Sequence, residues 1–498
     1  MKKTLKSLLG LTALFGLFTF TSCQKEHVGN GTQFRATIEG CTDQHGKTTL
    51  NGTALNWVSG DQIAIYGTAG AGVYSATPLA PATVAVFDNV SGETGDGPFR
   101  AFYPSTLTTD GVNITLPITQ TYVEGSIHKF PMYAESSNNQ LAFKNLCGVL
   151  KLHLTKAGVN ISSITVTAAS EINGTWSVDY NSGDPELAYS ANGTNATTLT
   201  CATPQSIAEG EDFYIYLPEG SYSGLQIEMT TDDSRYCVKT ANTAINVTRS
   251  QVTFITLGES NLTFRPVGSK GGLFYVSATQ QVWFSQGNLQ YQASTNMWRF
   301  AMNQYDYVGN DNENISATYS GWIDLFGWGT GNNPTLNTSN ESDYSTFTEW
   351  GNNFITNGGD VENIGWRTLT TIEWQYLLNN HSCGNGSING IHGLIILPVS
   401  WTLPAGCTFE EGFDGYLNWT HNSYTLAQWA AMESAGAVFL PAAGGRQGTE
   451  VWEVGLLGWY WSSTYGEYNS LIFDGGGFDA MGAGGLSGAG SVRLVRNN

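Results

Sequence analysis

The sequence predicts a mainly β N-terminal half followed by an α+β C-terminal domain. Between residues 34 and 262, short runs of alternating apolar and polar side chains are separated by turns rich in Gly, Pro, Asn and Asp, which is typical of strands. Residues 263–272 are rich in Gly and Pro, as domain linkers often are. From residue 273 to 498, Trp-rich strand patterns are interrupted by two helix-start signals.

The strands of the N-terminal half are predicted from alternation and from the turns that end each run. Pro104 and Pro218 end two of the runs, because proline cannot continue a sheet's hydrogen bonding. The predicted strands span residues 34–38, 62–66, 99–103, 114–116, 120–122, 141–146, 148–154, 164–168, 213–217, 226–229 and 252–257.

The C-terminal domain has two predicted helices. Thr370 with Glu373, and Thr425 with Gln428, have the spacing of a capping box, in which two side chains satisfy the free N–H groups of a helix start. Gly436 is expected to stop the second helix. Strands are predicted over residues 437–441, 460–464 and 491–496.

Composition limits the partners of the chain. Its 498 residues predict two to four domains, and its formal net charge is −20. Such a charge repels nucleic acid phosphates and anionic lipid, so no nucleic acid partner is expected.

Seven cysteines occur, and no two of them form a close CxxC pair, which gives zinc and thioredoxin-type sites no support. Cys383 and Cys407 fall in one predicted domain and are the best candidates for a disulfide. Buried free thiols are the alternative.

The first 22 residues have the pattern of a secretion signal. Lys2, Lys3 and Lys6 precede an apolar run over residues 8–20, which is too short to span a membrane. The small residues before Cys23 resemble a lipobox, which implies that Cys23 is lipidated; ordinary signal cleavage is the alternative. Residues 24–26, Gln-Lys-Glu, resemble the tag that sends Bacteroidota lipoproteins to the outer face of the outer membrane. Residues 23–33 then form a tether.

Four motifs in the N-terminal half occur in an order that resembles fimbrillin-like proteins, the fimbrial subunits and surface lipoproteins of Bacteroidota. The resemblance covers about residues 34–260 and implies two tandem β-sandwiches, over residues 34–150 and 151–262. The motifs are a Trp-x-x-Gly-Asp turn at 57–61, Phe-x-Ala-x-Tyr-Pro at 99–104, Leu-Pro-x-x-Gln-x-Tyr at 116–122 and Phe-Lys-Asn-Leu-x-Gly-Val-Leu at 143–150.

Residues 273–498 resemble a C-type-lectin-like fold, in the branch of formylglycine-generating enzymes and the variable proteins of diversity-generating retroelements. The resemblance rests on the order of its motifs, at residues 282–289, 322–329, 366–370, 439–446, 460–464 and 491–496. In those variable proteins the last two strands frame a hypervariable segment, which implies a ligand-binding segment at residues 465–490.

Most residues of segment 465–490 can be reached from an Asn codon by changing adenines, but Glu467 and Met481 cannot. Tyr465, Tyr468 and Phe478 are the best anchors for a ligand. The alternative is a Gly-rich surface loop without a binding function. The expected ligand-binding residues are Tyr465, Glu467, Tyr468, Asn469, Ile472, Asp474, Gly476, Phe478, Asp479, Ala480, Gly482, Ala483, Ser487 and Ala489.

The sequence gives enzymes and metal sites little support. No Cys follows Cys407, so the thiol pair of a formylglycine-generating enzyme has no counterpart. The calcium-holding triplets of sugar-binding C-type lectins do not occur, and no HExxH is present. No cofactor is expected, although a structural calcium ion in an Asp- and Asn-rich loop such as 306–314 is an open alternative. Aromatic residues between 283 and 366 could form a glycan platform, but core packing explains them more simply.

The sequence thus predicts a lipid-anchored, outward-facing outer-membrane protein that binds rather than catalyses. Its partner would be a protein or glycan on another cell, a phage or a host. The alternative is a fimbrial accessory or tip subunit, associated with fimbrial subunits, whose C-terminal domain is purely structural. A formylglycine-generating type of enzyme is the least favoured reading.

Overall fold

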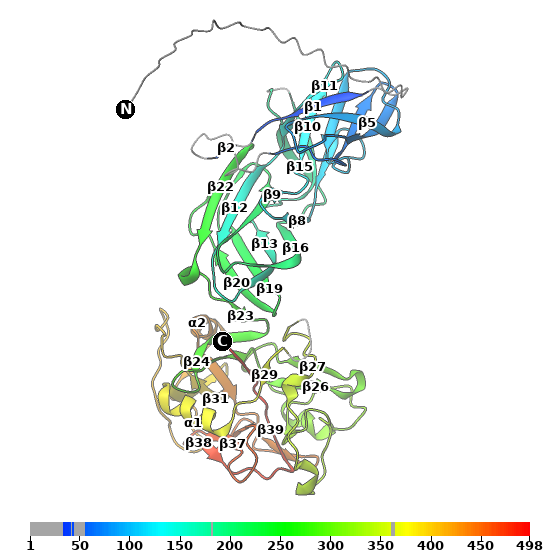
Figure 1. Cartoon of the computed structure of the whole chain (residues 1–498). Helices are drawn as coiled ribbons and strands as arrows, with labels where there is room; N and C mark the ends of the chain where they lie inside the picture. Colours follow the sequence, from blue (N-terminus) through cyan, green and yellow to red (C-terminus); the bar gives the residue numbers. More distant parts are fainter. Residues whose placement is uncertain (1–32, 41, 44–54, 181–182, 360–363) are drawn as a thin grey trace, which may run out of the picture.

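The computed structural model describes residues 33–40, 42–43, 55–180, 183–359 and 364–498. The predicted signal segment, Cys23 and residues 24–26 lie outside the described residues. The described chain forms three bodies in a row, with strand β1 in the first body and the C-terminus in the third, beside β23 and β24 (Figure 1). We call these bodies the first, second and third domains.

The first domain is a closed barrel, with strand order β1-β11-β10-β6-β3-β4-β5. Strand β1 closes it, because it pairs with β11 on one edge and with β5 on the other. The prediction of a two-sheet sandwich is therefore wrong for this domain, since both edges of β1 are hydrogen-bonded. The strands are β1 (Phe34–Ile38), β3 (Gln62–Gly67), β4 (Gly70–Ala76), β5 (Val84–Gly92), β6 (Phe99–Tyr103), β10 (Met132–Ser136) and β11 (Gln140–Asn145).

Aromatic rings fill the barrel. The buried ring of Trp57 meets those of Phe87, Tyr103 and Phe143 edge to face, with centroids 4.9 to 5.3 Å apart. Such contacts add stability beyond the area they bury. The motif residues at 57, 103 and 143 therefore converge on one core.

The second domain is a sandwich of a four-stranded and a seven-stranded sheet, ordered β17-β12-β22-β2 and β23-β20-β19-β13-β16-β8-β9. Residues from both sheets share one hydrophobic core. The strands are β2 (Thr42–Asp43), β8 (Thr119–Val123), β9 (Ser126–Ile127), β12 (Gly148–Leu154), β13 (Asn160–Thr167), β16 (Ala196–Ser206), β17 (Glu211–Leu217), β19 (Gln226–Thr231), β20 (Arg235–Thr240), β22 (Gln251–Leu257) and β23 (Arg265–Pro266).

Strand pairing crosses the expected division at residue 150. Val149 packs in the first core and Leu150 in the second, so the cores do separate at this point. However, β8 pairs with β16, and β2 pairs with β22. A cut at residue 150 would therefore separate paired strands. The remaining strands of this region are β7 (Asn113–Leu116), β14 (Gly174–Asp179), β15 (Glu186–Ala191), β18 (Gly220–Tyr222) and β21 (Ile245–Val247).

The predicted linker, residues 263–272, is built into sheets on both sides. Strand β23 pairs with β20 of the second domain, and β24 (Ser269–Tyr275) pairs with β25 (Gln281–Ser285) of the third. Arg496 also donates a 2.6 Å hydrogen bond from Nη2 to the backbone oxygen of Asp233. The second and third domains are thus joined by a short ordered connection and a direct contact.

The third domain combines small sheets and two helices. Its sheets are ordered β24-β25-β40-β29, β28-β39-β34-β35, β32-β30-β31-β33 and β36-β37-β38, with a β26–β27 hairpin. Their further bounds are β26 (Leu289–Gln292), β27 (Met297–Phe300), β28 (Phe326–Gly327), β29 (Trp366–Arg367), β30 (Cys383–Ile388), β31 (Ile391–Ile396), β32 (Ser423–Tyr424), β33 (Val438–Pro441), β34 (Gly445–Gln447), β35 (Glu450–Trp452), β36 (Gly458–Trp461), β37 (Ser470–Asp474), β38 (Gly477–Gly482), β39 (Gly488–Gly490) and β40 (Val495–Asn497).

Both helix predictions are confirmed, including their capping boxes. Helix α1 (Thr371–Asn380) starts after Thr370, and α2 (Leu426–Ser434) starts after Thr425. Gly436 follows the second helix with a φ of +113°, a backbone conformation that glycine adopts without steric cost. The 3-10 helices span Glu259–Asn261, Ala293–Thr295, Gly309–Asn314, Glu341–Tyr344 and Trp350–Asn352.

The predicted disulfide is absent, because Cys383 and Cys407 are both free, buried thiols. They belong to different hydrophobic cores, and each Sγ contacts a backbone oxygen, that of His381 or of Gln428. Burial raises the pKa of Cys383 to about 12. The alternative of buried thiols is the one that the structure shows.

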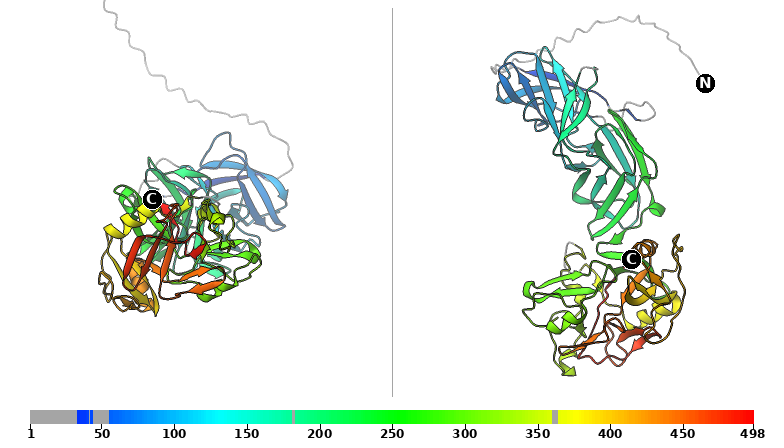
Figure 2. Two further views of the ribbon diagram at one scale, coloured as in Figure 1. Left: turned by 90° about the horizontal axis from the view of Figure 1, so that it is seen from below. Right: turned by 180° about the vertical axis from the view of Figure 1, so that it is seen from behind.

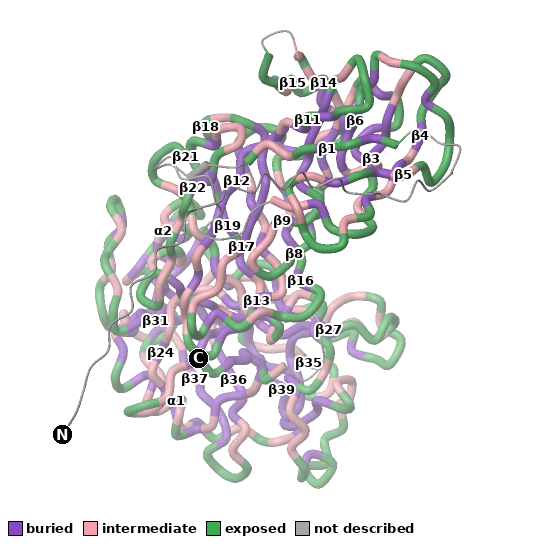
Figure 3. The backbone as a smooth tube through the Cα atoms, turned by 45° about the horizontal axis from the view of Figure 1, so that its top comes forward, coloured by how far each residue is buried: buried purple, intermediate pink, exposed green. Residues whose placement is uncertain are grey.

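Tryptophan packing dominates the interior of the third domain. Trp328, Trp350, Trp374 and Trp461 are all fully buried. Buried stretches lie on the strands of all three domains and exposed stretches on the connecting loops (Figure 3). In the part of the chain that the structure describes, no helix is long and apolar enough to cross a membrane.

Candidate functional site

The predicted variable segment forms a hairpin on a buried strand. Strand β36 is buried at all four positions and pairs with β37, which in turn pairs with β38. Trp461 of β36 donates from its indole to the backbone oxygen of Phe326, which ties the sheet to the core. Strands β37 and β38 lie at the end of the third domain farthest from the second domain (Figures 1 and 2).

Helix α1 supports this hairpin from one side. It packs against β37 and β38, and Gln375 donates from Nε2 to Sδ of Met481 at 3.2 Å. At the start of α1, Thr371 donates from Oγ1 to the backbone oxygen of Tyr468 at 2.8 Å. The loop of residues 462–469 is thereby held against the helix.

The loop between β36 and β37 exposes two of the expected anchors. Tyr465 is 63% exposed and Tyr468 is 51% exposed, and Glu467 between them is also exposed. The ring of Tyr465 lies against Trp328, with centroids 5.4 Å apart. The contact with Trp328 therefore holds the Tyr465 ring in place while most of the residue stays exposed, as a preformed binding contact needs.

A shallow hollow lies at the opposite end of β37, with a volume of about 430 Å³. Tyr416, Asp474, Phe478 and Asp479 line it, and Phe478 is partly covered by Phe413. Asp474 and Asp479 each accept a backbone hydrogen bond from two residues further on, at 2.7 and 2.8 Å. Each carboxylate keeps a second oxygen for a ligand.

A loop that is not predicted from the sequence completes this hollow. Tyr416 is 61% exposed and Leu417 is 55% exposed. Gly415 donates to the backbone oxygen of Gly475, which fixes the loop against the β37–β38 turn. Two adjacent bulky residues in a Gly- and Asp-rich loop are the only sequence signal, and nothing in the sequence links them to residue 475.

An aspartate–histidine pair lies in the loop beside the hollow. Asp414, next to Tyr416, is 3.0 Å from Nδ1 of His421. Desolvation opposes the effect, but hydrogen bonds from His421 hold the pKa of Asp414 below its usual value. For His421, desolvation acts to lower the pKa, but the hydrogen bond to Asp414 raises the pKa above its usual value.

Five expected ligand-binding residues are buried, so the prediction is wrong for them. Asn469 is fully buried, and its side chain bonds both the N–H and the C=O of Gly484 at 3.0 and 2.9 Å. Ser487 donates from Oγ to Glu341 at 2.7 Å. Successive side chains of a strand point to opposite faces of a sheet, and where the chain turns into the core these side chains face the protein interior. The buried residues are Asn469, Ala480, Gly482, Ser487 and Ala489.

The other expected residues reach the surface in part or in full. Gly476, Asp479 and Ala483 are exposed, and Ile472, Asp474 and Phe478 are half-buried. We define the distal face as the exposed or half-buried residues at both ends of β37. They are Tyr416, Leu417, Tyr465, Glu467, Tyr468, Asp474, Phe478 and Asp479. The face offers aromatic rings, hydroxyls and carboxylates.

Some polar groups of the loop suggested for calcium are hydrogen-bonded within the protein. Asn312 donates to Asp324 at 2.9 Å, and the Asp306 carboxylate accepts two bonds from Asn303. Among the described residues, no group of three or more His, Cys, Asp or Glu side chains is arranged to hold a metal ion.

Comparison with known proteins gives only distant similarities. No protein-family model and no curated protein matches the sequence. A candidate cell adhesion protein from Bacteroides ovatus is 14% identical, with 47% of this chain and 95% of that chain covered and a TM-score of 0.31. One from Bacteroides uniformis is 16% identical, with 47% and 95% covered and a TM-score of 0.30.

A fimbrial protein from Bacteroides ovatus is 10% identical, with 94% of this chain and 99% of that chain covered and a TM-score of 0.25. All three TM-scores lie below 0.5, so these are distant similarities.

Proposed function

We propose that the chain is a surface-anchored binding protein in which the first two domains form a stalk and the third presents the distal face to a ligand. Attachment through a lipid on Cys23 would hold the chain by the end that carries the first domain. The ligand would be a protein or glycan on another cell, a phage or a host. Binding would be non-covalent, without a cofactor.

One observation carries this proposal: the distal face lies at the far end of a row of three domains (Figure 1). A ligand that approached an anchored chain would meet this end first. The face also gathers exposed aromatic side chains, with Tyr416, Tyr465 and Tyr468 each more than half exposed. Tyrosine is enriched among the residues that contribute most to protein interfaces.

The positions that could vary are separated from those that hold the fold, which favours the idea of a replaceable surface. Tyr465, Glu467, Tyr468 and Asp479 are exposed, whereas the neighbouring Asn469 is buried and hydrogen-bonded. Changes at the first four would therefore alter the surface without opening the core. This separation is what a C-type-lectin-like variable protein requires.

The proposal is tested with the mature chain attached to beads through its residue-23 end. The beads are incubated with immobilised glycans, mucin glycoproteins and intact bacterial cells. We expect at least one probe to bind, and the variant Tyr416→Ala/Tyr465→Ala/Tyr468→Ala to bind it at least tenfold more weakly, since tenfold corresponds to about 1.4 kcal/mol.

A matched control removes exposed apolar side chains from the stalk instead. Leu79, Val90 and Val112 are each more than half exposed in or beside the first domain, and their triple Ala variant should bind as the unaltered chain does. Equal binding by the distal-face variant, or no binding by any probe, would contradict the proposal. A purely structural third domain would give that result.

A further inference from the structure

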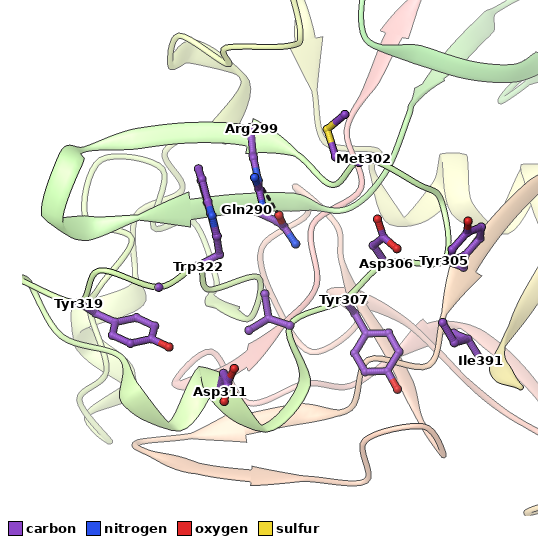
Figure 4. A pocket seen from close by; sticks show the side chains of 12 residues that line it. Gln290, Arg299, Met302, Tyr305, Asp306, Tyr307, Asp311, Tyr319, Trp322 and Ile391 are labelled. Carbon is purple, nitrogen blue, oxygen red and sulfur yellow. Dashed lines mark hydrogen bonds between the residues drawn. The ribbon is translucent and has the colours of Figure 1, made fainter. Parts of the chain in front are cut away.

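A second concave site lies on the third domain, apart from the distal face. It has a volume of about 710 Å³, within the range of small-ligand pockets. The β26–β27 hairpin supplies Gln290 and Arg299, the 3-10 helix Gly309–Asn314 supplies Asp311, and the following loop supplies Tyr319 and Trp322 (Figure 4). We call it the hairpin cleft.

A stacked cation and aromatic ring form one wall of the hairpin cleft. The guanidinium carbon of Arg299 lies 3.7 Å from the centroid of the Trp322 ring. Arg299 also donates from Nε to Oε1 of Gln290 at 2.8 Å. These two contacts fix the guanidinium in place, and its terminal Nη atoms make no hydrogen bond to any described residue.

Gln290 provides a hydrogen-bond donor that faces the cleft. It is only 4% exposed, and its Nε2 has no hydrogen-bond partner among the residues that the structure describes. The amide nitrogen points into the cleft (Figure 4). Nε2 is not one of the buried atoms without a hydrogen-bond partner, so it reaches the solvent of the cleft and is free to donate to a ligand oxygen.

Acceptors face these donors across the cleft. Asp311 is exposed, and its carboxylate accepts no hydrogen bond within the described chain. Asp306 uses only Oδ2, for two bonds from Asn303, so its Oδ1 is available. Tyr307 and Tyr319 also line the cleft, and their hydroxyls have no hydrogen-bond partner among the described residues.

We propose that the hairpin cleft binds a neutral glycan. Sugar hydroxyls both donate and accept, and this cleft presents donors at Gln290 and Arg299 and acceptors at Asp306 and Asp311. Aromatic rings between them can pack against the apolar face of a pyranose ring. The inference goes beyond the proposed function, because it does not involve the distal face.

The charges argue against the two other ligand classes. Two carboxylates and one guanidinium line the cleft, so an acidic sugar would meet a net negative charge. A basic peptide would bring its cation close to Arg299, which lies 3.7 Å from the Trp322 ring, and the like charges would repel each other. A neutral, hydroxyl-rich ligand meets neither obstacle.

Calorimetric titration of the mature chain tests the proposal. The probes are maltotriose, cellotriose, mannotriose and N-acetylchitotriose, with sialyllactose and tetralysine as the acidic and basic comparisons. We expect at least one neutral trisaccharide to bind more tightly than both comparisons. Preferential binding of sialyllactose or tetralysine, or binding by none of the four neutral probes, would overturn the proposal.

Variants then place the bound sugar. Trp322→Ala should weaken binding at least tenfold, and Asp311→Asn at least threefold; the second removes no hydrogen bond of the fold. Glu313→Gln is the matched control, an exposed acid on the same 3-10 helix that does not line the cleft. Unchanged binding by both cleft variants would overturn the proposal.

The distal-face variant separates the two proposals. If it abolishes trisaccharide binding while the cleft variants do not, the sugar sits on the distal face, and the hairpin cleft proposal fails while the proposed function stands. If the cleft variants alone abolish binding, the hairpin cleft proposal is supported, whatever the distal face binds.

Discussion

At the scale of single residues, Asn469 holds the binding loop in place through buried hydrogen bonds and does not contact a ligand. Its buried amide bonds both backbone groups of Gly484. Asn469→Ala would leave these groups unpaired, and we expect a loss of about 1–3 kcal/mol in the free energy of unfolding. Urea unfolding followed by tryptophan fluorescence measures this loss.

The neighbouring Glu467 is the control for that prediction. It is exposed, and Glu467→Ala should change the free energy of unfolding by no more than about 0.5 kcal/mol. Equal losses in the two variants would show that the assignment of Asn469 to the framework is wrong.

Asp324 gives the third domain a dependence on pH. Its buried carboxylate accepts bonds from the N–H of Val308 and from Asn312, at 2.8 and 2.9 Å. Burial raises its pKa to about 6, although these bonds act to lower it. A carboxyl whose pKa is higher in the folded than in the unfolded state contributes stability at low pH and loses it as the pH rises.

Asp324→Asn should therefore gain stability relative to the unaltered chain as the pH rises from 4 to 7. The gain is on the order of 3 kcal/mol, since each unit of pKa shift corresponds to about 1.36 kcal/mol. Because Asn cannot accept from both donors as the carboxylate does, the substitution also carries a cost that does not depend on pH, so the prediction concerns how the difference in stability changes with pH. Urea unfolding at pH 4, 5, 6 and 7 tests this, and parallel pH profiles would refute it.

At the scale of elements, the start of α1 is held by its capping box. Thr370 accepts from the N–H of Glu373 at 3.2 Å, and Glu373 accepts from the N–H of Thr370 at 2.8 Å. Thr370→Ala should lower the free energy of unfolding by about 1 kcal/mol. Thr370→Ser keeps a capping hydroxyl and should lose much less. Thermal unfolding compares the two, and equal losses would contradict a capping role.

The sequence predicts individual elements better than their closure into domains. The two capping boxes and the alternating strand patterns are local sequence signals, and the structure has the predicted elements at these positions, for example α1, α2 and β3. No local rule says that β1 pairs on both edges and closes a barrel. That outcome depends on contacts between residues 34–38 and residues more than 40 positions away.

The candidate site, too, could be predicted from the sequence only in part. Tyr465 and Tyr468 could be recognised from sequence because motifs frame their segment, and both are exposed. Tyr416 could not, because only the folded loop brings it to the hollow beside Asp474. The burial of Asn469 and Ala489 depends on which side of the chain faces the core, and a Gly-rich segment gives no regular alternation from which to predict it.

At the scale of the whole molecule, the junction of the second and third domains should resist bending. Arg496 reaches across it to Asp233, and Val267 donates to the backbone oxygen of Ser234 at 2.9 Å. Arg496→Ala should expose the connecting segment and speed tryptic cleavage after Lys270. Arg100→Ala, which removes an exposed ion pair of the first domain, is the control. Equal cleavage rates would argue against the contact as a brace.

The central claim is that the end of the third domain farthest from the anchored end contacts the ligand. The most direct measurement is the dissociation constant of the captured ligand, determined with the mature chain and with Tyr416→Ala/Tyr465→Ala/Tyr468→Ala. We predict a constant at least tenfold higher for the variant, at an unchanged melting temperature. An unchanged dissociation constant would contradict the claim, because the ligand would then bind elsewhere on the molecule.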